Sequence, residues 1–282
     1  MARAAFLMDR LLRKVGLSGK SFIPMLMGFG CTTPAILVAR TLEREKDRKL
    51  TMLLTPFMSC SARLPVFVLF AGTFFPEHPA WVVCFLYLLG IAVAVGFGCL
   101  LKHTVFSGGS APFLLELPPY RLPSWRTVGR HVWEKCGGFL LKAGTLILAM
   151  SIVLWMLQHV TPGLSVTGDA SESILGLLGA WLAPLFVPLG FGTWQAAVSL
   201  LSGLIAKESV VSTLAVLYAS GNAILLPQAL SAVFTPASAL AFLIFILLYM
   251  PCISAFATLK KELGTRSYGR ALFFASFSVI LI

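Results

Sequence analysis

Charged side chains are scarce in this sequence: they make up 12% of its 282 residues, whereas soluble domains carry about 25%. Apolar side chains account for 58%. So few charges could not cover a water-facing surface, which excludes an ordinary soluble enzyme, a disordered chain and a nucleic-acid-binding protein. Several apolar runs approach the length of about 20 residues that a spanning helix needs. We therefore predict an all-α, polytopic transmembrane helical bundle in a lipid bilayer.

Paired cysteine motifs are also absent. The six cysteines form no Cys-x-x-Cys pair and lie in or beside apolar runs, so neither a disulfide framework nor a zinc knuckle is predicted. Residues 14–21, KVGLSGKS, lack the first glycine of a phosphate-binding loop and are soon followed by Pro24. We expect no nucleotide-hydrolysing module in this chain. A membrane enzyme is not predicted either, because no nucleophile with a paired base lies near a break in an apolar segment.

A cleavable signal peptide is not visible either, because residues 1–20 carry basic charge throughout. We interpret them as an amphipathic segment along the cytoplasmic interface. The basic residues gather in four clusters, 3–20, 40–49, 102–142 and 260–270, whereas 71–80, 161–173 and 219–235 contain no Lys or Arg. The positive-inside rule places the clusters in the cytoplasm and the bare stretches outside, so most of these charges set topology rather than forming a binding site.

The apolar runs divide the chain into seven segments. Residues 21–39 carry Gly and Pro where a continuous helix would not, so we expect a broken or re-entrant segment there. Two crossings are expected at 174–190 and 193–218, the first of which is alternatively re-entrant. The predicted segments are an interfacial segment (1–20), a first repeat (21–75), a span (80–101), a cytoplasmic connection (102–136), a span (137–160), a second repeat (174–258) and a loop with the start of a final span (259–282).

An internal repeat supports this division. FIPMLMGFGC at residues 22–31 recurs as FVPLGFGT at 186–193, and FMSC at 57–60 is echoed by YMPC at 249–252. Gly- and Pro-interrupted segments in corresponding places of two halves indicate a binding site near the membrane midplane, because unwound backbone frees carbonyls and helix ends to coordinate an ion.

Three charges lie inside apolar runs. Lys207 and Glu208 interrupt SLLSGLIAKESVVSTLAVLY, and Arg63 interrupts the run that begins at residue 50. An unpaired charge there costs at least about 2.5 kcal/mol on insertion scales. If this run is a helix, Lys207 and Glu208 point about 100° apart and do not neutralise each other. Glu208 is expected to bind or relay a cation or, alternatively, to form a structural ion pair with Arg63; Arg63 and Lys207 are expected in gating or in structural ion pairing.

Three cysteines lie at breaks in apolar segments. Cys31 follows Gly30, Cys60 lies between two prolines, and Cys252 follows Pro251. Thiolate sulfur suits transition metals rather than magnesium or calcium, so these residues are candidate metal ligands; the alternative is that each is simply a small apolar side chain. Thr32, Thr33 and Ser59 are the further polar groups at these breaks.

Three blocks of the sequence closely resemble the ferrous iron transport protein B family. They are GFGCTTPAILVARTLEREKDRKLTMLLTPFMSCSARLPVF (28–67), GLIAKESVVSTL (203–214) and LLYMPCISAFATLKKE (247–262), in the family's order. The resemblance implies a membrane domain with two Gate, or nucleoside-recognition, repeats. It also implies that Cys31, Cys60 and Cys252 line an iron path and that Glu208 is the acidic residue of the second Gate block. Thr32 stands where the family commonly has Asn.

The resemblance further implies the function and its partners. The chain is expected to be the permease part of a ferrous iron importer, with Fe²⁺ as transported substrate and no bound cofactor, multi-pass in the cytoplasmic (inner) membrane of a prokaryote. Gating is expected to be coupled to a GTP-binding domain, with a small cytosolic accessory protein as a further partner and self-assembly left open. Because the resemblance begins inside the family's membrane domain, we expect a C-terminal fragment, a split-gene product or an incompletely assembled sequence.

Two other functions remain open at this point. A Gate-repeat permease for a nucleoside or other solute would tolerate replacement of the cysteines. A non-transporting scaffold would tolerate Glu208→Gln. Both replacements therefore discriminate among the hypotheses.

Overall fold

The computed structural model describes residues 8–9, 12–13, 16–104, 124–161, 173–219, 224–249 and 252–263. Regular structure in these ranges is helical, without an extended strand, which confirms the predicted all-α class. The helices are η1 (Gly19–Ser21), α2 (Phe22–Gly28), α3 (Thr32–Ala39), α4 (Glu45–Leu54), η2 (Thr55–Phe57), η3 (Ser61–Arg63), α5 (Leu64–Phe74), α6 (Pro79–Thr104), α7 (Trp125–His159), α8 (Ile174–Phe186), η4 (Val187–Leu189), α9 (Trp194–Ile205), α10 (Ser209–Ala219), α11 (Leu226–Val233) and α12 (Pro236–Leu248). Residues 253–263 are also helical.

The apolar segments are broken, as the glycine and proline pattern predicts. Helices α2 and α3 are separated at residues 29–31, where Cys31 takes an extended conformation (φ −151°, ψ 131°). Helices α8 and η4 are bent by 104° from α9. Gly190 lies at this second break with φ +81°, a conformation that glycine adopts without steric cost.

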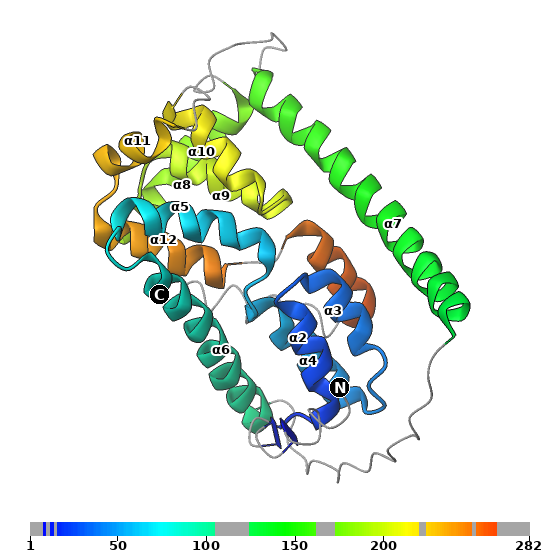
Figure 1. Cartoon of the computed structure of the whole chain (residues 1–282). Helices are drawn as coiled ribbons and strands as arrows, with labels where there is room; N and C mark the ends of the chain where they lie inside the picture. Colours follow the sequence, from blue (N-terminus) through cyan, green and yellow to red (C-terminus); the bar gives the residue numbers. More distant parts are fainter. Residues whose placement is uncertain are drawn as a thin grey trace.

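Two groups of helices meet in the middle of the molecule (Figure 1). One contains α2, α3 and α4 beside the helix at 253–263, and the other contains α5 and α8 to α12. The broken pair α2 and α3 belongs to the first group and the broken pair α8 and α9 to the second. Helix α6 contacts both groups, through α4 and through α5 and α12.

A cluster of phenylalanines forms the core of the larger group. Phe70 of α5 stacks on Phe242 of α12 at a centroid distance of 5.1 Å. Phe191, in the break before α9, packs edge-on against the same ring at 5.3 Å. Such pairs contribute about 0.5–1.5 kcal/mol each beyond the area they bury. The rings therefore hold the break before α9 against the helices of both repeats.

Three helical segments of the described chain are long and apolar enough to cross a membrane: Glu45–Phe74, Pro79–His103 and Pro236–Leu263. The bent pair Ile174–Leu189 and Trp194–Ile205 raises the number to as many as four if it forms one span. The exposed side chains of α6 are largely apolar, such as Phe85 and Leu88, which suits contact with lipid. The chain is thus a multi-pass membrane protein.

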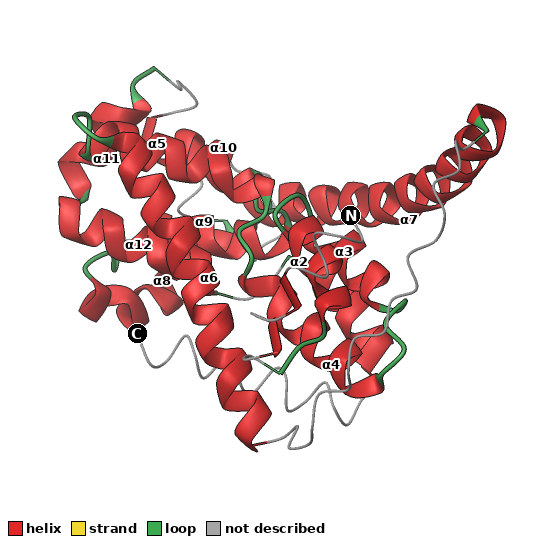
Figure 2. Cartoon of the chain, turned by 60° about the horizontal axis from the view of Figure 1, so that its bottom comes forward, coloured by secondary structure: helices red, strands yellow, loops and turns green. Residues whose placement is uncertain are grey.

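Helix α7 is longer than the span expected at 137–160. It begins at Trp125, with Ser124 as N-cap residue, and so includes residues 125–136 of the predicted connection. The helix extends this far because no proline follows Pro123 in that stretch. Figure 2 shows α7 projecting beyond the other helices, which it contacts at α8 and α9. Residues 105–123 of the predicted connection, and the final span predicted within 259–282, lie outside the described residues.

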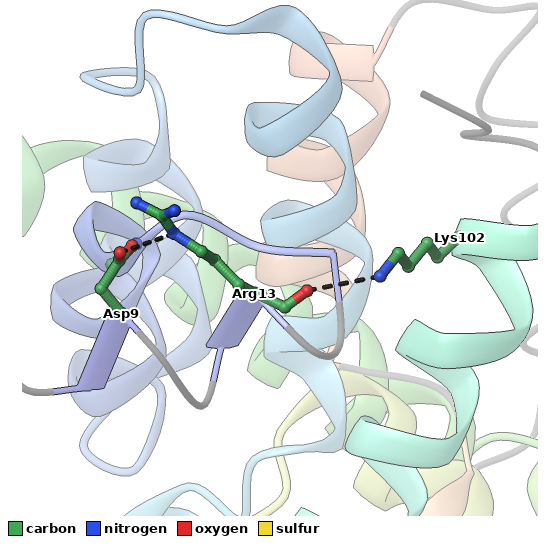
Figure 3. A network of polar contacts seen from close by, with 4 residues as sticks. Asp9, Arg13 and Lys102 are labelled. Atoms are coloured by element: carbon green, nitrogen blue, oxygen red, sulfur yellow. Dashed lines mark hydrogen bonds and ion pairs between the residues drawn. The ribbon is translucent and has the colours of Figure 1, made fainter. Parts of the chain in front are cut away.

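Polar contacts tie the N-terminal segment to the end of α6 (Figure 3). Asp9 pairs with Arg13 at 2.6 Å, and its other carboxylate oxygen accepts a 2.8 Å hydrogen bond from the Gly19 N–H. Lys102 of α6 donates to the Arg13 carbonyl at 3.3 Å. Gly16, between these contacts, has φ +90° and lies against the Lys102 side chain. These contacts therefore hold the described part of the N-terminal segment at the C-terminal end of α6.

Candidate functional site

Three breaks in the helices meet at one place, and two pairs of hydrogen-bonded residues join them. The Gly30 carbonyl accepts bonds from the Ser61 N–H at 3.2 Å and from Ser61 Oγ at 2.9 Å. Thr33 Oγ1 lies 3.3 Å from Ser254 Oγ and donates to it. The break before α3 is therefore bound both to the break before η3 and to the start of the helix at 253–263.

Each of the three predicted cysteines lies at one of these breaks, directly before a helix. Cys31 is the N-cap residue of α3 and Cys60 that of η3, and the Cys252 carbonyl accepts the bond from the Phe256 N–H that begins the last described helix. Cys60 is buried, Cys252 is half-buried and Cys31 is exposed. Cys31 is within electrostatic range of both other thiols.

The thiols do not surround one point. Among the residues that the structure describes, no three His, Cys, Asp or Glu side chains lie close enough to hold a metal ion together. Thr32, Thr33 and Ser59, the other polar residues predicted here, are buried, and Ser59 Oγ has no hydrogen-bond partner among the described residues.

Arg63 is fully buried beside these breaks. Its guanidinium is within electrostatic range of Cys60, Cys252 and Tyr249. Among the residues that the structure describes, two of its nitrogens, Nε and Nη1, find no hydrogen-bond partner. Within the described ranges no Asp or Glu forms a salt bridge with it, so the structure does not contain the alternative ion pair between Arg63 and Glu208.

Lys207 and Glu208 lie in a further break that differs from our expectation. The predicted span 193–218 is two helices, α9 and α10, because Ala206 takes an extended conformation (φ −143°, ψ 115°). Ser209 Oγ donates to the carbonyls of Ala206 at 2.7 Å and Ser202 at 3.2 Å, which satisfies backbone groups that the break exposes. The assumption of one continuous helix through Lys207 and Glu208 was wrong.

Because of this break, the side chains of Lys207 and Glu208 lie in different surroundings. Lys207 is 4% exposed, and its Nζ lies 5.0 Å from the centroid of the Tyr249 ring. It is also within electrostatic range of Arg63, Cys60 and Cys252. Glu208 is exposed. The structure therefore brings Lys207, but not Glu208, to the cysteine-bearing breaks.

Tyr249 is a member of this site that the sequence reasoning missed. It follows α12 in an extended conformation, and its buried Oη has no hydrogen-bond partner in the described ranges. A Cβ atom on Gly203 of α9 would lie 2.5 Å from this oxygen, so the hydroxyl is pressed against α9. The signal was present in the echo of FMSC by YMPC, which includes Tyr249 itself.

Comparison with known proteins shows that the chain is similar to part of several proteins named as iron transporters. The family description "Nucleoside recognition" matches residues 1–74 and 140–266, and "Ferrous iron transport protein B C terminus" matches residues 83–135. The "Fe(2+) transporter FeoB" of Staphylococcus aureus (strain COL) is 51% identical over 263 residues, which cover 93% of this chain and 39% of that protein.

Two more distant relatives also carry the name Fe(2+) transporter. The "Fe(2+) transporter FeoB" of Methanocaldococcus jannaschii is 41% identical over 288 residues, covering 100% of this chain and 42% of the relative. A protein of Porphyromonas gingivalis named "Fe(2+) transport protein A/Fe(2+) transporter FeoB fusion protein" is 40% identical over 311 residues, covering 94% of this chain and 37% of that protein. The chain thus spans about two fifths of the length of these relatives. No solved structure matches it.

Proposed function

Because this chain belongs to the ferrous iron transport protein B family, we propose that it is the permease part of a ferrous iron importer in the cytoplasmic (inner) membrane of a prokaryote. Fe²⁺ is its transported substrate. The observation that carries this proposal is the meeting of three cysteine-bearing helix breaks, joined by the contacts of Gly30 with Ser61 and of Thr33 with Ser254. Unwound backbone of this kind is where transporters coordinate ions.

The separated thiols suit conduction. Fe²⁺ must be bound strongly enough to enter and weakly enough to leave, which favours several successive contacts over one closed site. Sulfur ligands select transition metals over magnesium and calcium. We propose that Cys31, Cys60 and Cys252 contact the ion in turn, with the buried hydroxyls of Thr32, Thr33 and Ser59 beside them.

Glu208 is proposed as a separate carboxylate step on the same path. It lies at the break between α9 and α10 with its side chain exposed, free of any salt bridge within the described part of the chain. A carboxylate oxygen is a weaker and harder ligand than a thiolate, so an ion passing between the two kinds of ligand would be held tightly by neither.

The domain layout and the gating are part of the same proposal. Residues 21–75 and 174–258 form the two Gate repeats around the path, with spans at 80–101 and 137–160 between them. A GTP-binding domain would shift the path between states by binding one of them better than the other. The name of the Porphyromonas gingivalis relative joins a transport protein A to the transporter, which supports a small accessory protein as a partner.

Uptake of Fe²⁺ tests the proposal. Cells without an iron importer of their own would express this chain alone or with a separately expressed GTP-binding domain, under reducing conditions. We expect uptake with the GTP-binding domain. It should fall by at least about tenfold in Cys31→Ser, because loss of a direct ligand costs no less than loss of the outer partner that orients one, and it should also fall in Glu208→Gln. Cys84→Ser is the matched control, because Cys84 lies exposed on the unbroken helix α6.

The outcomes separate the alternatives. Fe²⁺ uptake that persists at the wild-type rate in Cys31→Ser and Glu208→Gln would overturn the proposed path. Absence of uptake in every combination, with the chain correctly inserted, would favour a scaffold. Loss of uptake in Cys84→Ser as well would show a general effect of cysteine replacement and would contradict the assignment of Cys31.

A further inference from the structure

The centre of the molecule contains two buried basic side chains, neither of which pairs with an Asp or Glu among the residues that the structure describes. Arg63 is 2% exposed and Lys207 is 4% exposed. Each is within electrostatic range of the other, and in the described ranges neither forms a salt bridge. Taking a charge out of water costs several kcal/mol unless an opposite charge and hydrogen bonds compensate. A negative group that balances these two side chains is therefore expected.

The unsatisfied groups around these side chains can all donate a hydrogen bond. Arg63 Nε and Nη1 carry N–H groups that can only donate, whereas the Tyr249 hydroxyl can donate or accept. Within the described part of the chain, none of these three buried atoms has a hydrogen-bond partner. Tyr249 lies close to the same centre, because Lys207 Nζ is 5.0 Å from the Tyr249 ring centroid. Buried polar atoms are nearly always paired, so three such atoms at one place indicate a ligand.

The three side chains come from different parts of the chain. Arg63 ends η3 in the first repeat, Lys207 lies between α9 and α10, and Tyr249 follows α12 in the second. Gly203 closes one side, since even a methyl group there would meet Tyr249 Oη. A ligand bound by these three side chains would therefore lie between the two repeats. Two neighbouring basic groups favour a negative ligand, and the N–H groups of Arg63 favour one that accepts hydrogen bonds.

We propose that Arg63, Lys207 and Tyr249 bind one small monovalent anion, such as chloride, between the two repeats. The anion accepts hydrogen bonds from the guanidinium and the phenol and balances part of the buried positive charge. This inference stands apart from the proposed function, because its measurement involves no iron.

Thermal unfolding of the purified chain in detergent tests the anion site. Sodium chloride would replace sodium gluconate stepwise at constant ionic strength, since gluconate is too large for the site. A ligand that binds only the folded state raises the unfolding temperature with a dependence on its own dissociation constant. We expect a saturable rise for the wild type. A saturable rise with formate instead of chloride would support the same site with a small carboxylate as its occupant.

Substitutions at the three residues test whether the rise in unfolding temperature comes from chloride bound at this site. Arg63→Met and Lys207→Met are expected to abolish the rise, and Tyr249→Phe to shift its midpoint to about tenfold higher chloride, the equivalent of one lost hydrogen bond of about 1.4 kcal/mol. Arg126→Met and Tyr218→Phe are matched controls that keep the rise, because Arg126 is exposed on α7 and Tyr218 Oη is bonded to Thr193.

Three results would overturn the proposal. The first is equal unfolding temperatures of the wild type in chloride, formate and gluconate, as expected if a buried water or the neighbouring thiols satisfy the cations. The second is a non-saturating rise shared by all variants, which is a general salt effect. The third is an unchanged midpoint in Tyr249→Phe, which decides the question even if Arg63→Met and Lys207→Met fail to fold.

Discussion

The ammonium of Lys207 lies over the ring of Tyr249, 5.0 Å from its centroid. Cation–π contacts of this kind contribute about 2 kcal/mol when both groups are removed from water. The contact joins the break between α9 and α10 to the end of α12. It therefore fixes the position of the YMPC break relative to the only lysine in the apolar run after Trp194.

Gly203 sets the position of Tyr249 in this contact. In Gly203→Ala the new Cβ would lie 2.5 Å from both Tyr249 Oη and Val210 Cγ2, so the ring or the helix has to move. We expect a loss of unfolding free energy of about 1–3 kcal/mol, the usual cost of overpacking, measured by thermal unfolding in detergent.

Gly72→Ala is the matched control for this substitution. Gly72 lies in α5, and nothing is within 4 Å of the position of its Cβ. Alanine there should stabilise the helix by about 0.5–1 kcal/mol. Equal effects of the two substitutions would show that Gly203 is not a position of close approach.

The bond between Thr33 and Ser254 is expected to couple the two cysteine-bearing breaks that it joins. A double-mutant cycle with Thr33→Val and Ser254→Ala should give an interaction free energy of about 0.5–1.5 kcal/mol, the net value of a hydrogen bond. The measurement is the free energy of unfolding of the wild type, both single variants and the double variant. Strict additivity would contradict the link between the breaks.

The N-terminal segment should be released when Asp9 is replaced. Asp9→Ala removes the ion pair with Arg13 and the acceptor of the Gly19 N–H. A hydrogen bond to a charged group contributes about 1.5–3 kcal/mol, so we expect faster proteolytic cleavage within the first 20 residues. Lys46→Ala, a substitution in α4, is a comparison at a different exposed position. Cleavage at the wild-type rate in Asp9→Ala would show that the segment is held by other contacts.

Glu43 and Lys20 form an ion pair outside the predicted spans, with an Nζ to Oε1 distance of 2.7 Å. The hydrogen bond and charge of Lys20 lower the pKa of the Glu43 carboxyl. A lowered pKa in the folded state means that the stabilisation is present above the ordinary carboxyl range and is lost as the pH falls through the folded value. The wild type should therefore unfold at a slightly higher temperature than Glu43→Gln at neutral pH, with the difference vanishing in acid and in high salt. A difference that grows in acid would give the opposite sign and refute the pairing.

The composition and the positions of glycine and proline in the apolar runs predicted most of the architecture. The breaks at Gly30 and Gly190 follow from residues that a continuous helix excludes, and the scarcity of charge determines the membrane class. The cysteines at 31, 60 and 252 were identified as break residues for the same reason. Their hydrogen-bonded link could not be predicted, because a contact such as Thr33 to Ser254 depends on tertiary packing.

The break at Lys207 is not marked by a glycine or proline. Residues 204–211 contain neither Gly nor Pro, so helical periodicity predicts a continuous helix there. Tertiary burial of Lys207 against Tyr249, together with the bonds from Ser209 Oγ, replaces the lost helical bonds. Two adjacent charges in an apolar run thus indicate a break in the helix even without Gly or Pro. Their side chains would leave a continuous helix in different directions, so one polar face could not take up both.

Helix α7 has a mechanical consequence. Its 35 residues make a rod about 52 Å long at about 1.5 Å per residue, whereas the hydrocarbon layer is about 30 Å thick. Its C-terminal end packs through Leu157 against Leu175 and Val198, which belong to the bent pair. A tilt applied to the exposed end near Arg126 would be carried along this rod to the bend before α9 without passing through a loop.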